Sequence, residues 1–83
     1  MICTDVEVKI KRGLTSNNLA HFIQKASGYK ADVFVQKGGR KANAKSLLGL
    51  LSLQISNEDR VTISAEGEDE EVAVSELEKY LKS

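Results

Sequence analysis

Apolar and polar residues alternate along the first ten positions of the chain. One set faces one way and comprises Ile2, Thr4, Val6, Val8 and Ile10, while the charged set on the other side comprises Asp5, Glu7, Lys9 and Lys11. A period of two residues predicts a strand with one buried and one solvated face. We expect Gly13 to end this strand.

The period changes near position 16. The apolar residues that follow are spaced i, i+3, i+4 and i+7, at Leu19, Phe22, Ile23 and Ala26. This spacing predicts an amphipathic helix with one apolar stripe. Ser16 is its expected N-cap and Gly28 its expected C-terminal stop.

A β-hairpin is predicted in the middle of the chain. Strands are expected over residues 32–36 and 40–44, and the second is polar enough to be an edge strand. Gly38-Gly39 joins them, because glycine accepts the positive φ of a tight hairpin turn.

The second half of the chain predicts a helix, a strand and a final helix. Ser46 is the expected cap of a short leucine-dense helix over 47–53, and the next strand covers 60–65. The last helix follows Gly67, with acidic residues at its start and lysines near its end, as the helix macrodipole favours.

The resulting element order is βαββαβα. One solvated strand face and three helices predict an α+β fold, a four-stranded antiparallel sheet covered on one face by three helices. The length of 83 residues predicts a single domain over 1–83.

Composition excludes several classes of function. Lys+Arg and Asp+Glu both total 12, so the formal net charge is zero, which argues against direct nucleic-acid binding. The single cysteine, Cys3, offers neither an intrachain disulfide nor a metal pair. No membrane span or signal peptide is recognisable. We therefore expect a soluble cytoplasmic protein without metal or cofactor.

The leucine-dense helix is more apolar than one buried face requires. Leu50 and Leu53 lie on one side of it, whereas Leu47, Leu48 and Leu51 lie on another. With the first pair in the core, the other three form an exposed apolar patch, which by default is a partner site. The alternative is that all five leucines are buried.

Ser46 stands at the start of this helix, where backbone N–H groups and the helix dipole favour an anion. A phosphate there would add a charge of about −1.5 to −2 beside the leucines and change which partners fit. The alternative is a plain N-cap without regulatory chemistry.

Other candidates for chemistry are weak. His21 has no triad partner at a suitable spacing, so we interpret it as a solvated or partly packed helix residue. The carboxylates of 66–71 are consecutive and point in different directions, which favours a charge-matched helix start over a metal site. A modest basic cluster around the hairpin is a solvated edge or a surface for an acidic partner. It comprises Lys37, Arg40, Lys41 and Lys45.

Several segments resemble HPr, the small phosphocarrier family of the bacterial sugar phosphotransferase system. The main one is 45–53, which resembles the family's regulatory-serine segment. The likeness continues through 24–27, 31–33, 43–45 and 63–70, and so covers nearly the whole chain. It implies the family's open-faced β-sandwich of four antiparallel strands and three helices, in agreement with the element order.

The chain departs from the family pattern where phosphate is carried. The family reads Gly-x-His-Ala-Arg-Pro in the loop after the first strand, whereas residues 13–18 here read GLTSNN. Thr15 replaces the phosphorylated histidine, Asn17 the arginine and Asn18 the proline. A hydroxyl forms no phosphoramidate, so no catalytic or phosphocarrier residue is expected.

The resemblance is greatest to the catabolite-repression branch, which lacks the histidine and keeps the serine. It implies phosphorylation of Ser46 by HPr kinase/phosphorylase and docking through Leu47, Leu48 and Leu51 to a catabolite control transcription factor. Two alternatives remain open. One is a constitutive interaction module that needs no phosphorylation, and the other is phosphocarrier activity through His21 or Thr15.

Overall fold

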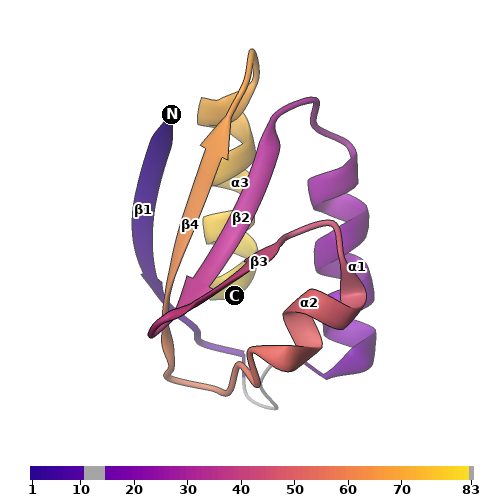
Figure 1. The fold of residues 1–83 in the computed structure, drawn as a ribbon, viewed down its shortest axis with the longest axis vertical. Coiled ribbons are helices and arrows are strands. Elements are labelled where there is room, and N and C mark those ends of the chain that lie inside the picture. The colour runs from indigo at the N-terminus through magenta and orange to yellow at the C-terminus, as the bar shows by residue number, and fades with distance from the viewer. Residues whose placement is uncertain (11–14, 83) are drawn as a thin grey trace.

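A computed structural model describes residues 1–10 and 15–82, so the predictions made for Lys11 and Gly13 lie outside the described residues. Seven elements follow one another along the chain (Figure 1). They are β1 (Ile2–Glu7), α1 (Ser16–Ser27), β2 (Asp32–Lys37), β3 (Arg40–Asn43), α2 (Leu47–Ser52), β4 (Arg60–Glu66) and α3 (Glu70–Lys82). The predicted order βαββαβα is confirmed.

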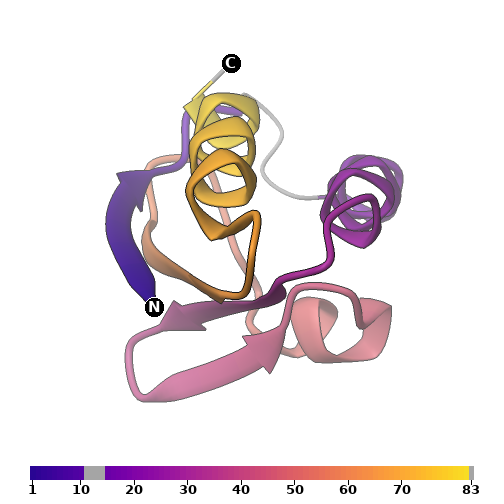
Figure 2. The ribbon, with the colours of Figure 1, turned by 90° about the horizontal axis from the view of Figure 1, so that it is seen from above.

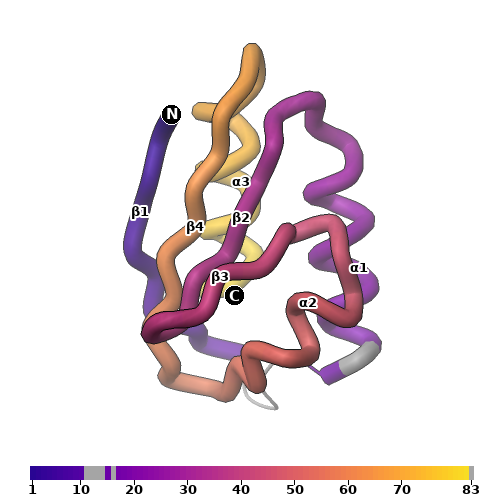
Figure 3. Tube along the Cα trace, viewed as in Figure 1, coloured from indigo at the N-terminus to yellow at the C-terminus, as the bar shows by residue number. Residues whose placement is uncertain are grey.

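The four strands form one antiparallel sheet in the order β1-β4-β2-β3. The tube view shows β4 lying between the N-terminal strand and the hairpin of β2 and β3 (Figure 3). β1 and β3 are therefore the edges of the sheet, as expected for the polar β3. Gly38 makes the hairpin turn with a φ of 60°, a conformation that favours glycine.

The sheet buries one face and leaves the other open. Seen from above, α3 and α1 lie on the same side of the sheet, with α2 next to β3 and α1 (Figure 2). The side chains between these layers are fully buried and include Phe22, Val33, Val35, Ile63 and Leu77. The predicted α+β open-faced sandwich is confirmed, because apolar residues at period two in the strands meet apolar stripes of the helices.

The first strand is shorter than predicted. Regular pairing with β4 ends at Glu7. Val8 still lies opposite Asp59 in the same register, but only its N–H bonds there, because its carbonyl accepts from the N–H of Glu58 at 2.7 Å. The N–H of Val8 donates to Asp59 O at 2.9 Å, and the N–H of Lys9 donates to Leu81 O at 2.8 Å. Val8 is nevertheless fully buried, so the alternating pattern continues after the ladder has ended.

The first helix begins one residue earlier than predicted. Thr15, not Ser16, is its N-cap, with extended backbone and a side chain that accepts from the N–H of Asn18 at 3.3 Å. Serine and threonine are both good caps, so adjacent hydroxyl residues leave the choice open from sequence. The C-terminal end at Gly28 is confirmed.

The loop between α1 and β2 is held by two opposite charges. The carboxylate of Asp69 accepts from the N–H groups of Lys30 and Ala31 at 2.8 and 2.9 Å. The ammonium of Lys45 donates to the carbonyls of Tyr29 and Ala31 at 3.0 and 3.1 Å. The peptide between Tyr29 and Lys30 is thus bound at both its polar ends, which satisfies backbone groups that no helix or strand pairs.

We predict that Asp69→Asn destabilises the fold in a pH-dependent way. Hydrogen bonds from the backbone of Lys30 and then Ala31 lower the pKa of Asp69 below its usual 3.8. The carboxylate therefore stabilises the fold above about pH 4, and this contribution is lost as pH falls through the lowered pKa of the folded state. Urea unfolding should show a deficit at pH 7 that shrinks toward pH 2.

Glu68→Gln is the matched control, since it removes a neighbouring exposed carboxylate. An equal deficit for Asp69→Asn at both pH values would contradict the prediction.

Candidate functional site

The candidate site is built on α2, a helix of only six residues. Ser46 has extended backbone and caps it, with its Oγ accepting from the N–H of Gly49 at 3.2 Å. Its carbonyl accepts from the N–H of Leu50 at 3.0 Å. The predicted N-cap is confirmed, and the Ser46 side chain remains partly exposed.

α2 lies close to β3 because Gly49 has no side chain. A Cβ at this position would come within 3.2 Å of the Cβ of Ala42 and 3.4 Å of the Ser46 Oγ. Real Cβ contacts are rarely this short, so any larger residue would push the helix outward. The close approach lets Leu50 and Leu53 enter the core, where both are buried.

The other three leucines stay on the surface. Leu48 is 81% exposed, and Leu47 and Leu51 are each 42% exposed. The predicted division of the helix is confirmed, and the alternative that all five leucines are buried is wrong. We call Leu47, Leu48 and Leu51 the leucine patch. Contiguous exposed apolar side chains rimmed by polar residues are characteristic of protein–protein contacts.

The start of α1 carries helix-capping chemistry. The Thr15 hydroxyl accepts from a backbone N–H in the first turn, and Asn17 is exposed there. Asn18 lies beside them, and its carbonyl accepts from Tyr80 Oη at 3.1 Å. His21 is exposed about 9 Å further along the axis and on another side of the helix. The structure does not bring this imidazole to the position of Thr15.

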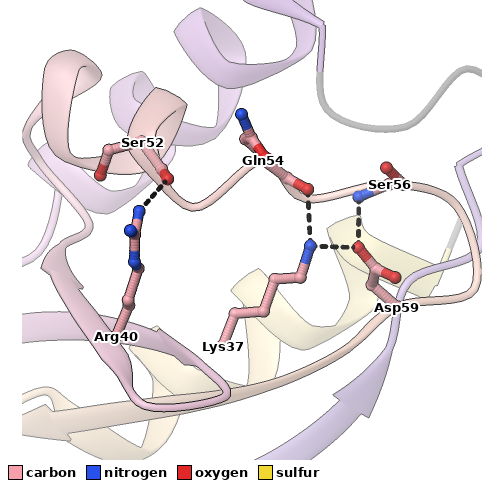
Figure 4. A network of polar contacts seen from close by, with 6 residues as sticks. All are labelled: Lys37, Arg40, Ser52, Gln54, Ser56 and Asp59. Atoms are coloured by element: carbon pink, nitrogen blue, oxygen red, sulfur yellow. Dashed lines mark hydrogen bonds and ion pairs between the residues drawn. The ribbon is translucent and has the colours of Figure 1, made fainter.

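Three of the four cations in the predicted basic cluster bind groups of this chain. Lys37 Nζ lies 2.6 Å from Gln54 O and 2.7 Å from the Asp59 carboxylate, and Arg40 donates to Ser52 O at 3.2 Å (Figure 4). Lys45 binds the loop carbonyls described above. The fourth, Lys41, lies over the ring of Phe34 at 4.6 Å from its centroid. The predicted edge is thus partly solvated, with Arg40 and Lys41 exposed, but three of its cations also bind groups of this chain, which the sequence did not indicate.

Sequence reasoning missed the role of Lys37 and Arg40, although the strand period carries a signal for it. The two residues pair across the hairpin and share the parity of Val35 and Ala42, which face the core. They therefore project toward the helix side of the sheet, whereas Lys41 has the opposite parity. Their acceptors could not be read from sequence, since Gln54 is 17 positions from Lys37.

The acidic segment at the start of α3 binds backbone and the N-terminus. Asp69 holds the α1–β2 loop, and Glu70 accepts from the N–H of Gly67 at 3.1 Å and pairs with the Met1 amino group at 3.2 Å. These contacts lower the pKa of Glu70, the backbone hydrogen bond of Gly67 most. Across 1–10 and 15–82, no three His, Cys, Asp or Glu residues are grouped so that they could hold a metal ion.

Within the same residues, none of the helices has the length and apolar character needed to cross a bilayer. The fold and site therefore define a small open-faced β-sandwich protein whose candidate site is an exposed apolar helix face rather than a cleft.

Comparison with known proteins identifies the family of this sandwich. Residues 2–83 match the family described as "PTS HPr component phosphorylation site". The chain is 44% identical over 82 residues to the HPr-like protein Crh of Bacillus subtilis, covering 99% of this chain and 96% of that protein. The chain therefore belongs to the HPr family, whose members are phosphocarrier or regulatory proteins of the phosphotransferase and catabolite-repression systems.

Solved structures agree with this assignment. HPr-C-His from Thermoanaerobacter tengcongensis superimposes with a TM-score of 0.95 at 40% identity, covering 100% of this chain and 93% of that one. Crystalline Bacillus subtilis Crh gives a TM-score of 0.80 at 44% identity, covering 99% and 94%. That structure is of an intertwined dimer with a swapped domain.

We predict that substitutions in the leucine patch and at the buried leucines of α2 change the free energy of unfolding by very different amounts. Leu50→Ala should lower the free energy of unfolding by about 2–5 kcal/mol, because it empties a buried site. Leu48→Glu should change it by less than about 0.5 kcal/mol, because this side chain is exposed. Urea unfolding measures both variants. A loss above 2 kcal/mol for Leu48→Glu would mean that the patch belongs to the core.

Proposed function

We propose that this HPr-family protein is a cytoplasmic regulator of carbon catabolism and no longer a phosphocarrier. In this proposal HPr kinase/phosphorylase phosphorylates Ser46, and the leucine patch then docks onto a catabolite control transcription factor. The protein itself acts as a single HPr-like unit over 1–83 and catalyses no reaction.

The observation that carries the proposal is the position of Ser46 directly before an exposed apolar patch. The serine side chain is partly exposed, and the leucines beside it are held on the surface by a helix whose other face is anchored in the core. A phosphate would place about −1.5 to −2 charge at the edge of this patch without any rearrangement of the fold. Phosphorylation would thus alter the electrostatics of a surface that already exists.

Loss of phosphocarrier activity is supported by the chemistry at the start of α1. A phosphorylated histidine transfers phosphate readily because its P–N bond is labile. The P–O ester bond of a phosphothreonine is not labile in this way. Thr15 in addition uses its oxygen to cap the helix. Asn17 and Asn18 supply no positive charge to stabilise a phosphate there.

Similarity to Bacillus subtilis Crh supports the same assignment, because the name of that crystalline relative refers to catabolite repression. The kinase and the transcription factor come from the resemblance of 45–53 to the family's regulatory segment.

Two phosphorylation reactions test the proposal on the same protein. We expect HPr kinase/phosphorylase with ATP to add one phosphate, mapped by mass spectrometry to Ser46 and absent in Ser46→Ala. We expect no transfer from phosphoenolpyruvate through the first enzyme of the phosphotransferase system, either to Thr15 or to His21. An unmodified protein in the first reaction, or a labelled one in the second, would refute the regulatory assignment.

A second candidate function is a constitutive interaction module. The observation that favours it is that the fold itself exposes the leucine patch, because Leu50 and Leu53 anchor the other face of α2 in the core. The two candidates differ in which residue the partner requires, because a constitutive partner needs the leucines alone.

A pull-down with wild type, Ser46→Ala and Leu47→Glu separates the candidates. For the regulated protein, treated with kinase and ATP, we expect recovery of the transcription factor to fall at least tenfold in both variants. Val72→Glu is the matched control, because it puts the same charge on an exposed apolar residue outside the patch. Equal recovery with wild type and Ser46→Ala, but loss with Leu47→Glu, would instead identify the constitutive module.

A further inference from the structure

The carbonyl groups at the C-terminal end of α2 need hydrogen-bond partners that the short helix itself does not supply. A helix of six residues is too short to be stable alone, and its last turn contains no basic residue. Its final carbonyls therefore need partners from elsewhere. The N–H groups of Leu53 and Gln54 return to Leu50 O and Leu51 O at 3.1 and 3.2 Å, which closes the last turn.

Two cations from the hairpin bind the next carbonyls in line. Arg40 Nη1 donates to Ser52 O at 3.2 Å, and Lys37 Nζ donates to Gln54 O at 2.6 Å (Figure 4). Positive charge at a helix C-terminus is favoured by the macrodipole. Both cations bind backbone carbonyls. These bonds therefore fix the path of the main chain and involve none of the leucine side chains.

Lys37 also fixes the segment that follows the helix. The Asp59 carboxylate that pairs with Lys37 accepts from the N–H of Ser56 with the same oxygen, each at 2.7 Å. These contacts lower the pKa of Asp59, the hydrogen bond from Lys37 most. The carboxylate is therefore ionised at neutral pH and balances the lysine charge.

The segment so bound contains backbone strain. Gln54 and Glu58 are the non-glycine residues with positive φ in the described chain, at 52° and 73°. Left-handed backbone is unfavourable for a residue with a side chain, and it persists only where the surroundings impose it. The Lys37 network spans this segment from Gln54 to Asp59.

The cross-strand register explains why these two cations project toward the end of α2. Lys37 and Arg40 lie directly opposite each other in the hairpin. Like charges in this position are unfavourable unless each has its own acceptor. Because both residues have core-facing parity, their acceptors lie on the helix side, at the end of α2.

We propose that Lys37 and Arg40 are positioning residues for the leucine patch. They hold the end of α2 so that Leu47, Leu48 and Leu51 keep one orientation for docking, and they make no contact with the partner themselves. The inference rests on the proposed function, in which the patch is the docking surface.

The test uses Lys37→Met and Arg40→Met, which keep the side-chain stem and remove the charge. Lys41→Met is the matched control, since this neighbouring lysine lies over Phe34 on the open face. Amide hydrogen exchange of Leu53 and Gln54 in the free protein reports on the last turn of α2. Affinity of the Ser46-phosphorylated protein for the transcription factor reports on docking.

We expect the amides of Leu53 and Gln54 to exchange about tenfold faster in Lys37→Met and in Arg40→Met than in wild type. We also expect each of these variants to bind the partner about threefold to tenfold more weakly, as loss of one charged hydrogen bond implies. Arg40→Lys should restore both values toward wild type, and Lys41→Met should change neither. Thermal unfolding followed by circular dichroism verifies that every variant is folded.

Four results would overturn the positioning role. Unchanged exchange would mean that the cations do not hold the helix, and faster exchange with full affinity would mean that its orientation is irrelevant. Weaker binding with unchanged exchange would identify a direct partner contact. Undiminished binding by Leu48→Glu would refute the docking patch, and the positioning role with it, while the exchange data would still show whether the cations hold α2.

Discussion

The burial of one sheet face under α1 and α3 is the interaction on which the rest of the structure depends. Strands β1, β2 and β4 contribute apolar residues at period two to this layer, β3 contributes Ala42, and the helices meet the layer with Phe22 and Leu77. The layer ends at β3, where Ala42 is small enough for α2 to lie against it through Gly49. Only Leu50 and Leu53 of this helix reach the core, so its remaining leucines stay in solvent. The leucine patch is thus a geometric consequence of how the sheet is covered.

The polar backbone of the connecting segments imposes a second constraint, which charged side chains meet. Lys45 and Asp69 bind opposite ends of the same peptide in the α1–β2 loop, while Lys37 and Arg40 bind carbonyls after and at the end of α2. The formal net charge of zero gives no sign of this arrangement, in which the charged side chains bind backbone groups of the same chain. Lysine is suited to this role, since its ammonium offers three donors on a flexible stem.

The elements, their order and the exposed leucines could be predicted from sequence, because each rests on a local period or on a turn residue. The strand period placed Val6 and Val8 on one face, which is buried, and the helical period separated Leu50 from Leu48. Predictions failed where a partner distant in sequence decides the outcome. Strand β1 ends at Glu7 because the N–H of Glu58 takes the Val8 carbonyl and the N–H of Lys9 donates to Leu81 O, and no pattern near Val8 encodes those partners. The acceptors of the hairpin cations were missed for the same reason.

Thr15 has a structural duty that needs no phosphoryl chemistry. The first turn of α1 needs an acceptor for its free N–H groups, and a threonine oxygen provides it at 3.3 Å. A histidine at a helix start could carry phosphate, whereas a threonine hydroxyl in such a place caps the helix and is a poor phosphoryl donor. Ser46 has the same capping duty at α2, yet it stands beside three exposed leucines whereas Thr15 stands beside Asn17 and Asn18. The two hydroxyls therefore differ in what a phosphate could alter nearby, and only at Ser46 would the added charge change an apolar surface.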